Sequence, residues 1–227
     1  MKKVIVITGG SDGLGRTLAE TLSPTNEVII LSPTETKLKE VAKRNKCQYH
    51  VCDVSDYSSV KNCIKEILTE YGTIDILINN AGLWIQEELD SNDEKRIKEV
   101  IEVNLLGPIN VTKAVLPTMK TNHTGLIINI NSQAGINHKA ERTVYNASKW
   151  GLTGFTKCLQ DEVAKYGVRV TDVMPGMMKT DMFNKMNIQK NMENGIDTKE
   201  VAKLIEFIIA LPNDVVIPEV GIKNIHN

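Results

Sequence analysis

The chain has 227 residues, enough for one large α/β domain with a well-buried core, and we expect residues 1–227 to form a single domain. Its 41% hydrophobic and 24% charged residues are ordinary for a globular protein, and a formal net charge of −1 argues against general attraction to nucleic acid or acidic membrane. The N-terminal apolar run is only about five residues long, too short for a signal peptide or a membrane span. We therefore expect a cytoplasmic protein that binds neither nucleic acid nor membrane.

The cysteines and histidines do not suggest a metal site. The four cysteines lack CxxC spacing, and the four histidines do not cluster with them. We interpret all four cysteines as small buried apolar residues in a reducing compartment, and we expect no bound metal. They are Cys47, Cys52, Cys63 and Cys158.

Six apolar runs predict the strands of a sheet. In chain order they begin at Val4, Val28, Tyr49, Ile74, Leu126 and Val168, and a final strand is expected within "DVVIPEVGIKN" near the C-terminus. Several runs are apolar at consecutive positions, which is typical of strands covered on both faces. Helical periodicity lies between them, most clearly in the stripe Val60, Cys63, Ile64, Ile67, Leu68 and Tyr71. This alternation predicts an α/β fold with a doubly wound parallel sheet and ligands at the carboxyl ends of its strands.

A glycine-rich stretch, "ITGGSDGLGR", follows the first predicted strand and opens a helix. In this context glycines allow the backbone to approach a pyrophosphate, and helix N–H groups bind it. Gly9, Gly13 and Gly15 have the spacing GxxxGxG, which differs from the common GxGxxG pattern. The alternative is a plain turn between a strand and a helix.

Two tyrosines precede a lysine by four residues. Tyr57 and Lys61 occur in "DYSSVK", at the edge of the apolar stripe of a helix, and no serine lies thirteen residues upstream. Tyr145 and Lys149 occur in "TVYNASKW", and Ser132 lies thirteen residues before the tyrosine at the end of a predicted strand. A nearby ammonium group would lower the pKa of a tyrosine from about 10 toward the range that proton transfer needs. The second pair is therefore the catalytic candidate.

Five motifs follow different predicted strands in a fixed order. They are "TGGSDGLG" after the first strand, "NNAG" after the fourth, Ser132 at the end of the fifth, "YNASK" thirteen residues later, and "PG" after the sixth. Together they resemble the short-chain dehydrogenase/reductase family over essentially the whole chain. The resemblance implies a single NAD(P)-binding Rossmann-type domain and an oxidoreductase that moves a hydride between nicotinamide and a carbonyl or secondary alcohol. A ketone or 3-oxoacyl-type reductase is expected.

The resemblance also implies a catalytic set of four residues. Tyr145 would exchange a proton with the substrate oxygen, Ser132 would hydrogen-bond that oxygen, and Lys149 would also hold the nicotinamide ribose. Asn104 lies on the apolar stripe of a long helix in "NLLG", where the family has an asparagine that supports a water relay to the lysine. The alternative for Asn104 is a helix irregularity close to Gly107 and Pro108.

The cofactor contacts follow from the same resemblance. "NNAG" would lie beside the adenosine ribose, or it could be a turn that braces the sheet. Asp53 would contact the adenine, or it could cap the next helix, although Ser55 or Asp56 would serve as well. The full set is Gly9, Ser11, Asp12, Gly13, Leu14, Gly15, Ser32, Thr34, Asp53, Val54, Asn80, Ala81, Gly82, Tyr145, Lys149, Pro175, Gly176 and Thr180.

The choice between NAD and NADP is read at the tip of the second strand, "LSPTETK". An acid there binds the ribose 2′-hydroxyl, whereas a basic residue meets a 2′-phosphate. This tip has neither an aspartate nor an arginine, and Glu35 is expected in the first turn of the next helix. Asp12 stands where many NADP-dependent relatives have arginine. Because Ser32 and Thr34 could donate to a phosphate, we expect NADP, with NAD as the alternative.

A methionine-rich segment follows the sixth predicted strand. Six of the eight methionines lie between residues 174 and 192, as core filler or as the lining of an adaptable apolar pocket. Residues 177–196 are expected to form a substrate lid. Other pocket candidates, each equally suited to packing, are Trp84, Gln133 and His138.

Two further expectations concern assembly and a rival function. The helices around residues 93–119 and 146–166 are expected to form the face of a homodimer or homotetramer, although the short C-terminus puts a tetramer in doubt. The rival function is a non-catalytic dinucleotide sensor that regulates a partner. A complete proton-transfer set argues against it, because binding alone does not need those residues.

Overall fold

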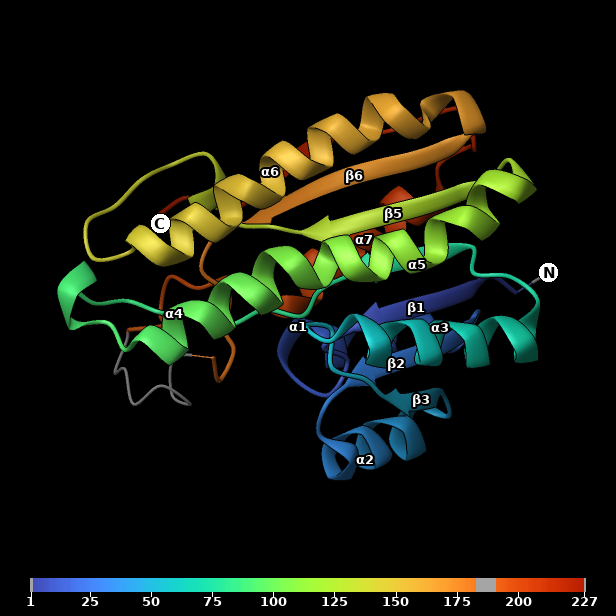
Figure 1. The fold of residues 1–227 in the computed structure, drawn as a ribbon, viewed down its shortest axis with the longest axis horizontal. Coiled ribbons are helices and arrows are strands. Elements are labelled where there is room, and N and C mark those ends of the chain that lie inside the picture. The colour runs from blue at the N-terminus through green and yellow to red at the C-terminus, as the bar shows by residue number, and fades with distance from the viewer. Residues whose placement is uncertain (1, 183–190, 227) are drawn as a thin grey trace.

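A seven-stranded parallel sheet forms the centre of the molecule in the computed structural model, which describes residues 2–182 and 191–226 (Figure 1). The strand order is β3-β2-β1-β4-β5-β6-β7. The strands are β1 (Val4–Thr8), β2 (Glu27–Ser32), β3 (Gln48–Val51), β4 (Ile76–Asn79), β5 (Gly125–Ile130), β6 (Val168–Pro175) and β7 (Glu219–Ile222). This confirms the predicted doubly wound α/β fold.

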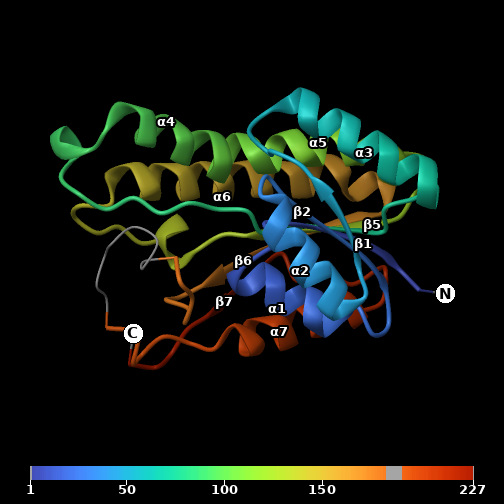
Figure 2. The ribbon, with the colours of Figure 1, turned by 90° about the horizontal axis from the view of Figure 1, so that it is seen from below.

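Helices cover both faces of the sheet (Figure 2). One layer contains α1 (Gly13–Leu22), α2 (Glu35–Asn45) and α7 (Thr198–Ala210). The other contains α3 (Tyr57–Tyr71), α4 (Glu94–Ile101), a π-helical turn (Glu102–Leu106), α5 (Gly107–Asn122) and α6 (Thr143–Val163). Short 3₁₀ segments are η1 (Leu89–Ser91), η3 (Gln133–Gly135) and η4 (Ala164–Tyr166).

Alternate residues of the central strands enter different cores. In β1, Ile5 and Ile7 pack with α1, α2 and α7, whereas Val4 and Val6 pack with α3, α5 and α6. Side chains along a strand point alternately to opposite faces, so a strand with a helix layer on each side needs apolar residues at every position. The consecutive apolar runs of the sequence have this cause.

Strand limits differ from the prediction by one or two residues. β2 and β3 each begin one residue earlier than predicted, and β4 begins at Ile76, after the buried Ile74. Glu35 opens α2, as expected, and Asp56 caps α3.

The prediction that all four cysteines are buried was wrong for Cys158. Cys52 and Cys63 are buried and Cys47 is half-buried, but Cys158 is exposed because it lies on the outer side of α6. In residues 2–182 and 191–226, no three histidine, cysteine or acidic side chains are grouped so as to hold a metal ion. None of the helices in these ranges has the length and apolar character to cross a bilayer.

Candidate active site

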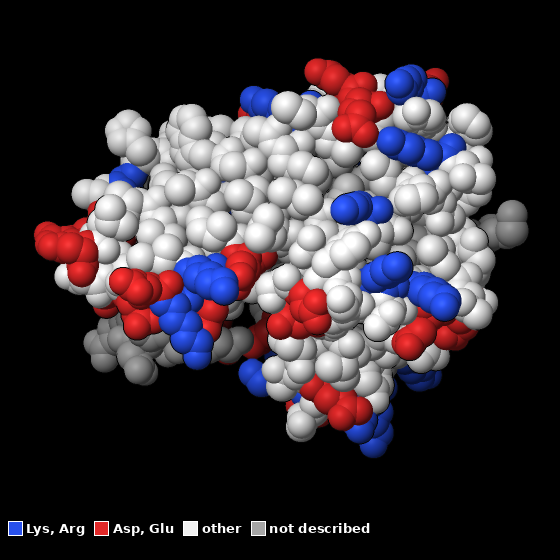
Figure 3. All heavy atoms as spheres, viewed as in Figure 1, with Lys and Arg blue, Asp and Glu red and all other residues white. Residues whose placement is uncertain are grey.

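A cleft of about 940 Å³ opens at the carboxyl ends of the strands. Residues that follow each of β1 to β6 line it, and the chain leaves β1 for β2 on one side while β4 lies on the other. Ligands of doubly wound sheets bind at such a reversal of strand order. Figure 3 shows the surface hollowed between the part that carries α4 and the part that carries α2, with charged side chains on the rim.

The glycine loop lies at the floor of this cleft. Gly9 has a positive φ of 65°, and a Cβ on Gly15 would overlap the carbonyl oxygen of Gly9. Only glycine allows the start of α1 to pack so closely on the end of β1. In the first turn of α1, the N–H groups of Leu14 and Gly15 have no acceptor within the helix, so they suit an anionic ligand. The loop thus has the shape that a pyrophosphate requires.

The segment after β4 is tied directly to this loop. The Thr8 hydroxyl accepts hydrogen bonds from the backbone N–H groups of Asn80 and Ala81, both at 3.0 Å. The Asn80 amide donates to the carbonyl oxygens of Thr8 and Gly9, at 2.9 and 3.2 Å. "NNAG" therefore braces the glycine loop and also lines the cleft with Gly82, so both interpretations of this motif hold geometrically.

Near the tip of β2, the first turn of α2 brings to the cleft a basic residue, Lys37, that was not among the predicted site residues. The hydroxyl of Ser11 donates to that of Ser32 at 3.0 Å, and Thr34 precedes α2 as its N-cap residue. Lys37, in the first turn of α2, lines the cleft and forms an ion pair with Asp12 at 3.6 Å. The sequence feature that could have identified Lys37 is its position three residues after Thr34, because residues three apart lie on the same face of a helix.

Asp53 and Val54 line the cleft just after β3. The Asp53 carboxylate accepts hydrogen bonds from the N–H and hydroxyl of Ser55, at 2.9 and 2.7 Å, so it shapes the turn after β3. The helix cap itself is Asp56, which accepts from Ser58 N at 2.8 Å. Val54 is buried and lines the cleft.

The loop after β6 reaches over the glycine loop. A Cβ on Gly13 would lie 3.4 Å from the side chain of Thr180, while Pro175 and Gly176 line the cleft. The expected lid, residues 177–196, is closed at its base by a bridge between Met178 and Ile196, with Lys179 N and Ile196 N donating backbone hydrogen bonds at 2.9 Å. Residues 183–190 of the expected lid, including Met186, lie outside the described residues.

Tyr145 and Ser132 meet at the centre of the cleft. Ser132 follows β5 and caps η3, where its hydroxyl accepts from Ala134 N at 3.1 Å. Tyr145 lies in the first turn of α6 and is buried. Burial raises the pKa of Tyr145, against a hydrogen bond with Ser132 and the positive charge of Arg142, which lower it. The expected lowering of this pKa came from the ammonium group of Lys149, whereas the positive charge that lowers it here is that of Arg142, and burial outweighs that charge.

Lys149 lies one helical turn after Tyr145, and its ammonium group donates to the carbonyl oxygen of Ile130 at 3.0 Å. Burial lowers the pKa of Lys149 to about 8, while the negative charge of Asp172 opposes that shift. Burial also raises the pKa of Asp172 to about 6, against a hydrogen bond from Asn131 at 3.0 Å. The buried carboxylate of Asp172 thus stabilises the protonated form of Lys149.

Asp172 belongs to a row of polar side chains inside the sheet. Asn79, Asn129 and Asp172 are neighbours in register across β4, β5 and β6, and all three are buried. Asn79 donates to Asn129 at 2.9 Å, and Asn129 donates to Thr156 of α6 at 2.8 Å. Because buried polar groups need partners, this row fixes α6 on the sheet and so fixes Tyr145 and Lys149.

Asn104 lies in the π-helical turn and is fully buried. Its side chain accepts from Leu83 N at 2.7 Å and donates to Leu83 O at 2.9 Å, which holds the segment after β4. It also donates to the Ser148 hydroxyl at 3.2 Å, beside Lys149. The expected helix irregularity is therefore confirmed as a π turn, a feature that often occurs at functional sites, and Asn104 lies behind the cleft wall formed by Leu83 and Val103.

The wall next to Tyr145 is apolar and aromatic. The rings of Trp84 and Tyr145 lie 4.3 Å apart between centroids, at 50°. Three described methionines, Met177, Met182 and Met192, pack against this cluster, whereas Met174 is buried in the sheet and Met178 packs on the opposite core. Gln133 lines the cleft while donating to Met174 O at 2.9 Å, and His138 lines it from an exposed position.

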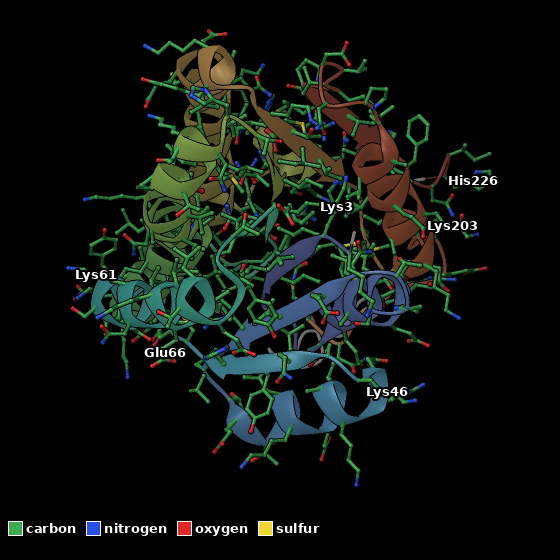
Figure 4. All side chains as sticks on the ribbon, turned by 90° about the vertical axis from the view of Figure 1, so that its right-hand side faces the viewer. Lys3, Lys46, Lys61, Glu66, Lys203 and His226 are labelled. Carbon is green, nitrogen blue, oxygen red and sulfur yellow. The ribbon has the colours of Figure 1, made fainter. Side chains whose placement is uncertain are left out.

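The second tyrosine–lysine pair is far from this chemistry. Tyr57 opens α3 and its ring faces the ammonium group of Lys113, at 4.9 Å from the ring centroid. Lys61 points away from the body of the molecule (Figure 4). The pair serves as an internal comparison for Tyr145 and Lys149.

Comparisons with known proteins agree with this geometry. The family model described as short chain dehydrogenase matches residues 3–191. The 3-oxoacyl-[acyl-carrier-protein] reductase of Haemophilus influenzae is 33% identical, over 91% of this chain and 90% of its own.

Two solved structures are similar along nearly their full length. An alcohol dehydrogenase from the archaeon Thermococcus sibiricus, complexed with 5-hydroxy-NADP, has a TM-score of 0.90 and 28% identity, covering 100% of this chain and 98% of its own. The closed form of a serine dehydrogenase complexed with NADP+ has a TM-score of 0.93 and 26% identity, covering 99% of this chain and 96% of its own.

Proposed function

Because this chain belongs to the short-chain dehydrogenase family and is therefore an NAD(P)-dependent oxidoreductase, we propose that it interconverts a carbonyl compound and its secondary alcohol at Tyr145. The observation that carries the proposal is the meeting of Ser132, Tyr145 and Lys149 within one cleft that begins at the glycine loop. The names of the three similar proteins refer to a 3-oxoacyl group, an alcohol and serine, and each has a carbonyl or a hydroxyl group to transform.

In the proposed reduction, the cleft would hold a reduced nicotinamide, whose chemistry is the supply of a hydride to a carbonyl carbon. The Tyr145 hydroxyl donates its proton to the carbonyl oxygen, so the C=O double bond becomes a C–O single bond with a new C–H bond at carbon and a new O–H bond at oxygen. The Ser132 hydroxyl donates a hydrogen bond to the same oxygen and holds it beside Tyr145. Oxidation of the alcohol follows the same steps in reverse.

Lys149 and Asn104 support this proton transfer. The ammonium group of Lys149 stabilises the phenolate that Tyr145 becomes and also holds the nicotinamide ribose. The side chain of Asn104 is fixed by hydrogen bonds to Leu83 and Ser148. From this position it would orient a water molecule that returns a proton to Lys149.

The proposed direction is reduction. A similar protein from Haemophilus influenzae is named a 3-oxoacyl-[acyl-carrier-protein] reductase, and a tyrosine hydroxyl that donates its proton serves that direction. We therefore propose a ketone reductase.

NADP is the proposed cofactor, and Lys37 its main specificity residue. Lys37 lies beside Ser32 and Thr34 at the wall of the cleft, where a ribose 2′-phosphate would meet an ammonium group and two hydroxyls. The glycine loop suits the pyrophosphate, and the two similar solved structures contain NADP or its 5-hydroxy derivative. Lys37 also offsets the negative charge of Asp12 at the start of α1.

The test replaces each tyrosine of the two matched pairs. Tyr145→Phe is expected to lower kcat by at least about 100-fold, since general acid catalysis contributes about 10²–10⁴-fold, with NADPH affinity nearly unchanged. Tyr57→Phe, at the same spacing from a lysine, is expected to keep the full rate. Turnover is measured with NADPH and a panel of ketones, and binding by nicotinamide fluorescence.

Two outcomes would contradict the proposal. A Tyr145→Phe enzyme that retains most of its rate would remove Tyr145 from the chemistry. Cofactor binding without oxidation of NADPH or NADH by any carbonyl in the panel would favour the dinucleotide sensor.

A further inference from the structure

Arg142 places a positive charge on the substrate side of the cleft. It precedes α6 and lies three residues before Tyr145. Its guanidinium carbon lies 5.0 Å from the centroid of the Trp84 ring, and that ring packs in turn against Tyr145. Arg142 also lines the cleft, and its charge acts directly on the Tyr145 hydroxyl. The cation therefore lies beside the point where the substrate carbonyl is proposed to react.

Within the described part of the chain, this guanidinium has no carboxylate partner. No acidic side chain lies within ion-pair distance of it, and its Nε atom is buried without a hydrogen-bond partner. Burial lowers the pKa of Arg142, which is the expected effect when a charge leaves water without full compensation. An unpaired, partly buried arginine is a site prepared for an anion.

The adjacent Glu141 raises the pKa of Arg142 through its negative charge, and its carboxylate also accepts a hydrogen bond from Gln86 at 3.3 Å. Glu99 and Glu102, which line the same cleft, have cationic partners: Glu99 pairs with Arg96 at 3.2 Å, and Glu102 lies 3.6 Å from Lys98. The other arginine of the cleft, Arg96, differs from Arg142 because it has both an acidic partner and the Trp84 carbonyl oxygen, at 3.1 Å.

The backbone before Arg142 has an unusual conformation that fixes its direction. Glu141 has a φ of 63°, in the left-handed region that non-glycine residues seldom adopt. The two other such residues described, Lys46 and His123, end helices, where this conformation is common. Glu141 instead precedes a helix, and such strain persists where surrounding structure imposes it at functional sites.

We propose that Arg142 binds the carboxylate of the substrate, so that the natural substrates are short oxo acids and the corresponding hydroxy acids. This inference rests on the proposed function of Tyr145. The guanidinium carbon lies 5.0 Å from the centroid of the Trp84 ring, and that centroid lies 4.3 Å from the centroid of the Tyr145 ring, so we place the carboxylate within a few bonds of the reacting carbonyl. A single planar guanidinium over an aromatic ring matches a singly charged, planar carboxylate better than a phosphate dianion, which needs more donors.

The test compares an acid with its neutral ester. With NADPH, the wild-type enzyme is expected to have a kcat/KM for 3-oxobutanoate about 10–100-fold above that for methyl 3-oxobutanoate, since hydrogen bonds to charged groups contribute about 1.5–3 kcal/mol. Arg142→Met is expected to lower this acid-to-ester ratio by about the same factor, mainly through KM. Lys139→Met, an exposed lysine at the same cleft, is the matched control and should keep the ratio.

A binding measurement makes the result independent of turnover. In a Trp150→Phe background, which leaves Trp84 as the single tryptophan, 3-hydroxybutanoate and its amide are titrated into the NADPH complex. The proposal is supported if 3-hydroxybutanoate binds more tightly than its amide and if Arg142→Met abolishes this difference.

The contradicting outcomes are distinct. Equal use of acid and ester, or equal loss of both in Arg142→Met, would overturn the carboxylate site but leave the ketone reductase intact. Arg142-dependent inhibition by inorganic phosphate that is stronger than that by acetate would replace the carboxylate with a phosphorylated substrate. A protein that reduces no carbonyl yet still binds the acid through Arg142 would overturn the proposed reaction and retain the anion site.

Discussion

Lys149 is a buried cation whose charge depends on a neighbouring strand. Water would normally stabilise an ammonium group, but here burial lowers its pKa to about 8 and the carboxylate of Asp172 in β6 opposes that shift. The carboxylate is itself held by Asn131, which also donates to Thr153 of α6 at 2.8 Å. Asp172 can therefore be described as a positioning residue that acts through Lys149.

This arrangement predicts the alkaline limit of activity. The protonated form of Lys149 prevails below its pKa, so turnover should fall as the pH rises through about 8. Asp172→Asn removes the charge that raises the pKa of Lys149, so the fall should begin at a lower pH. Asp161→Asn, an exposed residue of α6, should leave the profile unchanged.

The measurement is kcat against pH with saturating NADPH and ketone. A limb that Asp172→Asn displaces to lower pH, and that Asp161→Asn leaves in place, would support the action of Asp172 on Lys149. Coincident profiles for wild type and Asp172→Asn would refute the role of Asp172.

At the residue scale, the sequence predicted residues that the structure brings into one cleft, Ser132, Tyr145 and Lys149, but not the charged residues that act on them. Ser132, thirteen residues upstream, distinguishes Tyr145 from Tyr57 as the proposed proton donor. The guanidinium group of Arg142 lies over the ring of Trp84, which is 58 residues earlier in the sequence. In the sequence, Asp172 is only one polar position in an apolar strand. Such contacts between distant segments require the three-dimensional structure.

The starts of α1 and α2 together form the cofactor end of the cleft. Asp12 caps α1 by accepting from Gly13 N at 2.7 Å, which puts a negative charge where a pyrophosphate should bind. Lys37 offsets this charge from the first turn of α2. The negative charge of Asp12 would oppose the binding of a phosphate, and the ammonium group of Lys37 in α2 offsets this charge.

Replacement of Lys37 should change cofactor preference. Lys37→Met is expected to weaken both cofactors, because the positive charge that offsets Asp12 is removed, and to lower the preference for NADPH over NADH about tenfold, or about 1.4 kcal/mol. Lys39→Met, two residues further along α2 and paired with Glu35, should change neither. Fluorescence titration of both cofactors at one ionic strength measures the ratio, and an unchanged ratio would exclude Lys37 from phosphate recognition.

Element types followed from the sequence more readily than their irregularities. Consecutive apolar runs predicted all six early strands because both faces are covered, and the final strand was found as β7. The π turn at 102–106 was visible only as a polar residue on an apolar stripe. Its hydrogen bonds to Leu83 explain why Asn104 is there, and no periodicity encodes that partner.

The face formed by α5 and α6 is the predicted contact between two copies of the chain. Exposed apolar residues, Leu106 and Trp150, lie at 43% and 52% exposure on the two helical regions that the sequence analysis assigned to a dimer. Figure 3 shows few charged side chains over the middle of this face. Such a surface favours association with a second apolar surface.

Light scattering tests this assembly. At micromolar concentration the protein is expected to have twice the 25.2 kDa mass of one chain. Leu106→Glu, which adds a charge to an exposed position, should yield monomers, whereas Phe207→Glu on α7, at the opposite layer, should not. A monomeric wild-type protein would remove the prediction.

The closed base of the segment 177–196 has a consequence for how this molecule can change. The bridge between Met178 and Ile196 brings both ends of the segment together on the rim of the sheet. Insertions between two fixed ends cost little, since loop closure entropy grows only slowly with length. We therefore expect that a longer or more polar segment can be placed between these two ends. Such a replacement should alter which substrates bind, while the strands and the proposed proton-transfer residues stay in place.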